Sequence, residues 1–132
     1  MEKKVIIITG ASRGIGREIA KTLAQEGHTV IANYNKSEEQ AKQLKKELEE
    51  KGKEIEIYKA DVSKEEECKK IVEYTIKKYK KIDVLINNAG IDKLQLIIDV
   101  TKKDWDNIIN TNLYGAFCMS QQAAKNMIQN KN

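Results

Sequence analysis

The sequence predicts an α/β protein in which a parallel β-sheet carries helices on both faces. Four apolar runs of strand length alternate with four segments that repeat apolar residues at helical spacing. The first run, Val5–Ile8, contains only β-branched side chains, which is typical of a strand buried on both faces. Alternation of this kind indicates right-handed crossovers between parallel strands.

The strands are expected at residues 4–9, 28–34, 54–60 and 82–86. The third alternates Ile55 and Ile57 with polar residues, so we expect it nearer a sheet edge than the first. The only histidine, His28, starts the second strand. We expect it at the surface or in a loop, without a catalytic role.

The helices are expected between and after these strands. The first covers 14–26 and stops at Gly27, and the second is capped by Ser37 and stops at Gly52. The third starts at residue 63 or 64, with glutamates in its first turn. A long helix is capped by Thr101 or Asp104 and, if continuous to about residue 130, spans roughly 39 Å. The third helix is expected to bury Cys68, Ile71, Val72, Thr75, Ile76 and Tyr79.

Composition excludes several classes of protein. The 132 residues are 40% hydrophobic and 33% charged, which suits one domain over residues 1–132. Lysines alternate with glutamates and the net charge is only +4, so no nucleic-acid surface is expected. No membrane span or secretory leader is evident, and the expected location is the cytoplasm. Cys68 and Cys118 fit core thiols better than a disulfide or a metal site.

The most informative stretch is the glycine-rich turn between the first strand and the first helix. Its glycines are Gly10, Gly14 and Gly16, in a Gly-x-x-x-Gly-x-Gly spacing. Glycines let backbone N–H groups approach a ligand, and a helix N-terminus offers unpaired donors and the positive end of its dipole. The turn therefore predicts a phosphate-binding site.

Turn residues also follow the other three strands, at 33–37, 61–62 and 87–90. The carboxyl ends of parallel strands share one edge of the sheet, where ligands of such folds bind. After the second strand no acidic residue occurs before Glu38. A carboxylate there would bind the ribose of NAD, whereas Arg13 and Lys36 can bind a 2′-phosphate. The pattern favours NADP(H) over NAD(H), although Lys36 also fits a solvated surface lysine.

Four motifs, in order, resemble those of the short-chain dehydrogenase/reductases. They are Thr9 to Gly16, Asp61-Val62, Asn87-Asn88-Ala89-Gly90 and Asn110-Thr111-Asn112. Within this family the chain most resembles the 3-oxoacyl-acyl-carrier-protein reductases of fatty-acid synthesis. The resemblance implies a Rossmann-like sheet of strand order 3-2-1-4, bound NADP(H), and reduction of a 3-oxoacyl thioester to the 3-hydroxy form.

The resemblance also implies roles for individual residues. Asp61 would accept a hydrogen bond from the adenine amino group while Val62 packs on the ring, and Asn87 would be structural. Asn112 matches the active-site asparagine, which binds a water molecule that orients the catalytic lysine. As a plain helix residue, Asn112 would bond to backbone at a small kink. The remaining expected cofactor-binding residues are Gly10, Ser12, Arg13, Gly14, Ile15, Gly16, Asn35, Lys36, Ser37, Asn88, Ala89 and Gly90.

The catalytic serine and Tyr-x-x-x-Lys pair of the family lack counterparts at the expected places. The single Tyr-x-x-x-Lys, Tyr74 to Lys78, lies in the third helix, and we interpret it as coincidence. We therefore expect the cofactor-binding N-terminal half of a reductase, truncated after the long helix and inactive alone. A non-catalytic dinucleotide-binding or assembly module, and a sugar or polyol dehydrogenase fragment, stay open. The expected partners are a small-molecule or carrier-protein-linked substrate and a second copy, bound through helix 105–130 or the open edge of the fourth strand.

Overall fold

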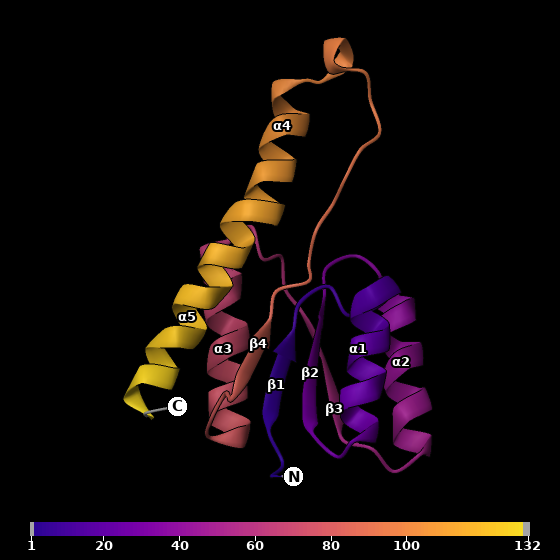
Figure 1. The fold of residues 1–132 in the computed structure, drawn as a ribbon, viewed down its shortest axis with the longest axis vertical. Helices are drawn as coiled ribbons and strands as arrows, with labels where there is room; N and C mark the ends of the chain where they lie inside the picture. The colour runs from indigo at the N-terminus through magenta and orange to yellow at the C-terminus, as the bar shows by residue number, and fades with distance from the viewer. Residues whose placement is uncertain (1, 131–132) are drawn as a thin grey trace.

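The computed structural model describes residues 2–130, which form one parallel sheet with helices on both faces (Figure 1). The strands are β1 (Val5–Ile8), β2 (Thr29–Tyr34), β3 (Ile55–Lys59) and β4 (Val84–Ile86). Their order is β3-β2-β1-β4, and every neighbouring pair is parallel. This confirms the predicted fold class and strand order, including the place of β3 at an edge.

The central strand β1 packs against a hydrophobic core on each side. Ile6 and Ile8 belong to one core, together with residues of helices α1 (Gly14–Gln25) and α2 (Glu38–Glu50). Ile7 belongs to the other core, with residues of α3 (Glu65–Tyr79) and α5 (Gly115–Gln129). Successive strand side chains point to opposite faces, so the run of β-branched residues fills both cores.

The helix ends follow the expected signals with one exception. Gly27 and Gly52 follow α1 and α2 with φ angles of 97° and 72°, the left-handed conformation that glycine adopts at little cost. Thr101 caps α4 (Lys102–Ile109) in a capping box with Asp104. Ser37 precedes α2, but its side chain makes no capping hydrogen bond.

The predicted long helix is interrupted. A single π-helical turn, Asn110–Tyr114, separates α4 from α5. Within this turn the carboxamide of Asn112 accepts a hydrogen bond from the N–H of Ile91 and donates one to its carbonyl, both at 2.8 Å. The regular α-helix is thus interrupted where a side chain bonds to backbone far away in the sequence, as expected for π turns.

The expectation for His28 at the surface was wrong, because the residue is buried. Its Nδ1 accepts a hydrogen bond from the backbone N–H of Lys4 at 3.1 Å, which ties the start of β2 to the chain before β1. Cys68 and Cys118 are buried free thiols, as predicted. Burial, followed by the neighbouring Cys118, raises the pKa of Cys68, so this thiol stays protonated.

The connector from β4 to α4 rises well beyond the carboxyl edge of the sheet, and a short 3₁₀ turn, Ile97–Asp99, lies at its tip (Figure 1). Several of its aliphatic side chains are exposed, among them Leu94, Leu96 and Ile98. No helix within residues 2–130 combines the length and the apolar character that crossing a membrane would need.

Candidate functional site

A cavity of about 510 Å³ opens at the carboxyl ends of the strands. Turns after all four strands contribute to its lining, which is where a parallel sheet places its ligands. The structure thus brings together twelve of the residues expected from the sequence: Gly10, Ser12, Arg13, Gly14, Asn35, Lys36, Ser37, Asp61, Val62, Asn88, Ala89 and Gly90.

Three expected site residues lie outside this lining. Ile15 is exposed and faces a separate groove between α1 and β4, next to Ile86. Gly16 is buried behind the glycine turn. Asn112 lies one residue beyond the lining residue Thr111, and its carboxamide is bonded to the backbone of Ile91, which itself lines the cavity.

The glycines of the turn are required by close approach and by backbone conformation. Gly10 and Gly14 have φ angles of 62° and 59°. A Cβ on Gly10 would lie 2.8 Å from the Cα of Ala89, and one on Gly16 would lie 2.3 Å from the carbonyl oxygen of Gly10. A Cβ on Gly14 would meet nothing within 4 Å, so the backbone there is open to a ligand.

The N-terminus of α1 suits an anion. The first turns of α2, α3 and α4 contain acidic side chains that complement the helix dipole, whereas the first turn of α1 contains none. The residue before α1 is Arg13, and its side chain makes no capping hydrogen bond. The first N–H groups of this helix are therefore available to a phosphate oxygen.

Thr9 holds the turn after β4 against the glycine turn. Its hydroxyl oxygen accepts hydrogen bonds from the backbone N–H groups of Asn88 and Ala89 at 3.0 and 2.9 Å. The Asn88 carboxamide in turn donates to the carbonyl of Gly10 at 2.9 Å. Asn87 instead donates to the hydroxyl of Ser120 on α5, which fits its expected structural role.

Asp61 is bonded through only one of its carboxylate oxygens. This oxygen accepts hydrogen bonds from the backbone N–H and the hydroxyl of Ser63, at 3.0 and 2.6 Å. The second oxygen has no hydrogen-bond partner within residues 2–130 and remains available to a donor. Val62 beside it is buried.

Two cationic side chains line the cavity. Arg13 and Lys36 both line it, and neither forms an ion pair with another of the described residues. The nearest acid in sequence, Glu38, accepts a hydrogen bond from the hydroxyl of Tyr34 and is paired with Lys42 at 3.7 Å. Burial first, and then Glu38, raises the pKa of Tyr34, so the phenol stays neutral.

The cavity lining also includes residues that were not expected to bind the cofactor. Asn107, Asn110 and Thr111, on α4 and the π turn, share one helix face at i, i+3 and i+4 spacing. Asn110 and Thr111 belong to the fourth family motif, which was the available signal. Asn33 and Tyr34 lie in the cluster 33–37 that the sequence placed at this edge, whereas Ala60, Ser63 and Ile91 adjoin the expected strand-end residues.

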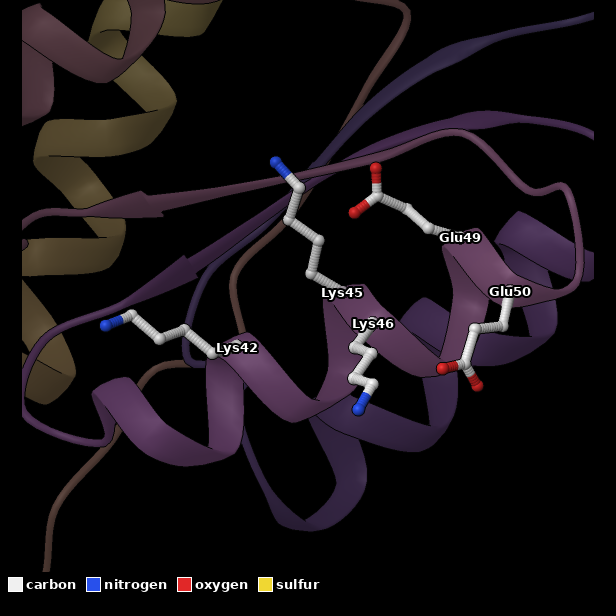
Figure 2. A pocket seen from close by; sticks show the side chains of 5 residues that line it. All are labelled: Lys42, Lys45, Lys46, Glu49 and Glu50. Carbon is white, nitrogen blue, oxygen red and sulfur yellow. The ribbon is translucent and has the colours of Figure 1, made fainter.

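Two other features are not part of this site. A shallow hollow of about 430 Å³ on α2 is lined by lysines and glutamates whose side chains spread in different directions, and no strand end reaches it (Figure 2). Tyr74 and Lys78 of the Tyr-x-x-x-Lys sequence both bond to Glu56 on β3 and do not line the cavity. Burial, with Glu56, raises the pKa of Tyr74, which opposes a role as a base.

Comparison with known proteins identifies relatives that are about twice as long as this chain. The chain is 39% identical over 128 residues to the 3-oxoacyl-[acyl-carrier-protein] reductase FabG of Staphylococcus epidermidis. It is 38% identical to the protein of the same name from Staphylococcus aureus. Each match covers 97% of this chain and 52% of the relative, so the chain spans about half the length of these proteins.

Solved structures agree with this relationship. A short-chain dehydrogenase/reductase mutant of Serratia marcescens matches 93% of the chain and 50% of its own length, with a TM-score of 0.88 at 31% identity. A metagenomic blue fluorescent protein in complex with NADPH matches 92% of the chain and 50% of its own, with a TM-score of 0.85 at 35% identity. The family model for short chain dehydrogenase matches residues 4–132. The chain therefore belongs to the short-chain dehydrogenase/reductase family.

Proposed function

We propose that this chain forms the NADP(H)-binding half of a reductase that converts a 3-oxoacyl thioester on an acyl-carrier protein to the 3-hydroxyacyl form. The observation that carries the proposal is the cavity at the strand ends, with an open glycine turn and two cations that are unpaired among the described residues. Its lining offers N–H donors for a pyrophosphate, a carboxylate oxygen for adenine and two cations for a 2′-phosphate, which supports this cofactor.

Each part of the cavity suits one part of the cofactor. The pyrophosphate would lie on the N-terminus of α1, where the backbone at Gly14 is open. The free oxygen of Asp61 would accept a hydrogen bond from the adenine amino group, with Val62 against the ring. The segment from Asn88 to Gly90 would contact the ribose next to the nicotinamide. The bound nicotinamide would supply the hydride for the carbonyl carbon.

Asn112 would act by fixing the wall of the nicotinamide end. Its carboxamide uses both its acceptor and a donor on the backbone of Ile91, two hydrogen bonds of 2.8 Å. Ile91 follows Gly90 directly, so the bonds hold this part of the connector at the cavity. A wall held in one position keeps the reacting carbonyl in one orientation.

Preference for NADP(H) rests on Arg13 and Lys36. A cavity with two unpaired cations and no carboxylate at the end of β2 attracts a 2′-phosphate. The NADPH complex of a similar fluorescent protein supports this cofactor. We expect NADPH to bind more tightly than NADH in a fluorescence titration of the purified protein, and tighter binding of NADH would refute the preference.

The double variant Arg13→Ala/Lys36→Ala tests these two side chains directly. We expect the Kd for NADPH to rise by roughly a hundredfold, because two charge-assisted contacts are lost, while the Kd for NADH changes little. Lys46→Ala on α2 serves as the control, since Lys46 is outside the cavity. An equal rise of the Kd for NADPH and for NADH would show that these cations do not bind the 2′-phosphate.

A second candidate function is dinucleotide binding without catalysis. Tyr74 and Lys78, the one Tyr-x-x-x-Lys pair in the chain, are engaged with Glu56 outside the cavity, which favours this alternative for the 132 residues by themselves. Oxidation of NADPH in the presence of an acetoacetyl thioester separates the two functions. Turnover by these residues would exclude the non-catalytic module, whereas cofactor binding without turnover agrees with the module and with a reductase half that lacks its catalytic residues.

A further inference from the structure

Asn33, near the end of β2, has a buried carboxamide that bonds to the glycine turn, to its own strand and to the end of β3. The residue is only 2% exposed. Its Oδ1 accepts a hydrogen bond from the N–H of Gly10 at 3.1 Å. Its Nδ2 donates to the carbonyls of Ala60 at 3.0 Å, and of Tyr34 and Tyr58 at 3.3 Å. The proposed function assigns no role to this side chain.

The surroundings of Asn33 accept only a carboxamide in one orientation. The side chain meets an N–H donor on one side and three carbonyl oxygens on the other, so oxygen must face Gly10 and nitrogen must face the carbonyls. A carboxylate would place a negative oxygen against those carbonyls. An alanine would leave several buried polar groups without a partner.

These bonds connect two corners of the cavity. Gly10 begins the glycine turn, and Ala60 directly precedes Asp61. Backbone bonds strengthen the link, because the N–H of Ala11 donates to the carbonyl of Asn33 at 2.8 Å. Thr9 and Asn88 attach the same turn to β4 on the other side. Asn33 therefore sets the position of the turn relative to Asp61.

We propose that Asn33 is a positioning residue that pre-forms the adenosine half of the dinucleotide site. The inference rests on the proposed function, since it assigns the span between the glycine turn and Asp61 to the adenosine half. Asn33 lines the cavity but acts through Gly10 and Ala60, by holding the phosphate-binding turn and the adenine-binding strand end at a fixed separation. The site then binds its ligand without first ordering the turn.

The test compares NADPH with adenosine 2′,5′-bisphosphate, which carries only the adenosine half. In Asn33→Ala we expect the Kd of both ligands to rise by the same factor, about tenfold, so that their ratio stays at the wild-type value. Asn33→Asp keeps the shape and the acceptor of the side chain but loses its donors. We expect the Kd of both ligands to rise about as much as in Asn33→Ala. An Asp variant that binds like wild type, or a loss confined to NADPH, would overturn the inference.

A control separates this role from loss of stability. Ile71→Val removes one buried methylene from the core beneath α3, outside the cavity, and destabilises the fold without changing the Kd of either ligand. If wild-type protein binds neither ligand, the proposed function fails. If it binds both and Asn33→Ala binds them equally well, only the role of Asn33 fails.

Hydrogen exchange of the wild-type protein gives a measurement that needs no variant. A pre-formed turn requires the Gly10 amide to be protected in the absence of any nucleotide, because Asn33 already accepts its hydrogen bond. Protection of Gly10 that arises only when adenosine 2′,5′-bisphosphate is added would overturn the inference.

Discussion

Asp83 illustrates how single side chains fix the strands that carry the site. Its Oδ2 accepts a hydrogen bond from the N–H of Val5 at 2.8 Å and forms an ion pair with the ammonium of Lys81 at 3.0 Å. Burial alone would raise the pKa of Asp83, but these two donors outweigh it and lower the pKa below its ordinary value of 3.8. The ionised carboxylate therefore ties the start of β4 to β1.

Acid should remove the stabilisation that the ionised carboxylate of Asp83 provides. A lowered folded-state pKa means that the stabilisation is complete above the unfolded-state pKa and disappears as pH falls through the folded-state value, below 3.8. We expect Asp83→Asn to lose about 1–2 kcal/mol of unfolding free energy at pH 7. Urea unfolding at pH 7, 5 and 3 should show the difference from wild type shrinking towards pH 3. A difference independent of pH would contradict the assignment.

The sequence predicted some buried positions correctly and others wrongly. The β-branched run Val5–Ile8 predicted a central buried strand, and the structure has that strand. The burial of His28 depends on the N–H of Lys4, which lies 24 residues away in the sequence. Asn33 belongs to an apolar strand, and nothing in its local sequence indicates that three carbonyls surround its amide. Long-range partners of this kind leave no local pattern.

Among the helices, the end of α3 stores backbone strain. Lys80 has a φ of 71° and is the one non-glycine residue with positive φ in the described part of the chain. Its N–H donates to the carbonyl of Ile76 at 2.8 Å, which is the left-handed helix ending that glycine normally provides. A side chain in this conformation costs about 1–2 kcal/mol.

Lys80→Gly should therefore stabilise the protein, by about 1 kcal/mol. Lys77→Gly provides the matched control, because it introduces glycine into the last turn of α3, where helical conformation makes it destabilising by about the same amount. Urea midpoints of the two variants should move in opposite directions. A lower midpoint for both would show that Lys80 does not adopt the left-handed conformation.

At the level of elements, the sequence predicted the order of strands and helices better than their continuity. Apolar periodicity indicated α1, α2 and α3 to within a few residues, and terminal glycines marked the ends of α1 and α2. The expected long helix is divided at Asn110–Tyr114 because Asn112 bonds to Ile91, 21 residues earlier. Helical periodicity extends through a π turn almost unchanged, so it could not indicate the interruption.

The molecule as a whole leaves the edge of its sheet at β4, and part of the helical arm formed by α4, the π turn and α5, without neighbours. β4 is an edge strand, and β1 is its only partner within residues 2–130. On α4, α5 and the turn between them, large apolar side chains are exposed, including Trp105, Leu113 and Phe117. Large apolar side chains exposed together on one arm mark an interaction surface.

We therefore expect the protein to self-associate through this surface. Sedimentation equilibrium should detect a dimer or larger species at micromolar concentration, and Trp105 fluorescence should shift to shorter wavelength as protein concentration rises. Phe117→Lys should weaken association by at least tenfold, because it buries a charge at the interface. Lys46→Glu on α2, outside this surface, should leave association unchanged. If the protein stays monomeric and its Trp105 emission does not change with protein concentration, this surface is not an interface.

The single π turn between α4 and α5 also lets the arm hold one extra residue without a change of direction. A π turn holds one residue more than an α-helical turn, and each residue of an α-helix advances its direction by about 100°. Deleting one residue within Asn110–Tyr114 would therefore restore an α-helical turn and leave Cys118 and Met119 facing the core. A deletion within α5 has no such turn to absorb it, and would rotate the residues beyond it by about 100°. A deletion scan from Asn110 to Gln129 should therefore yield more folded protein for deletions in the π turn than for deletions in α5.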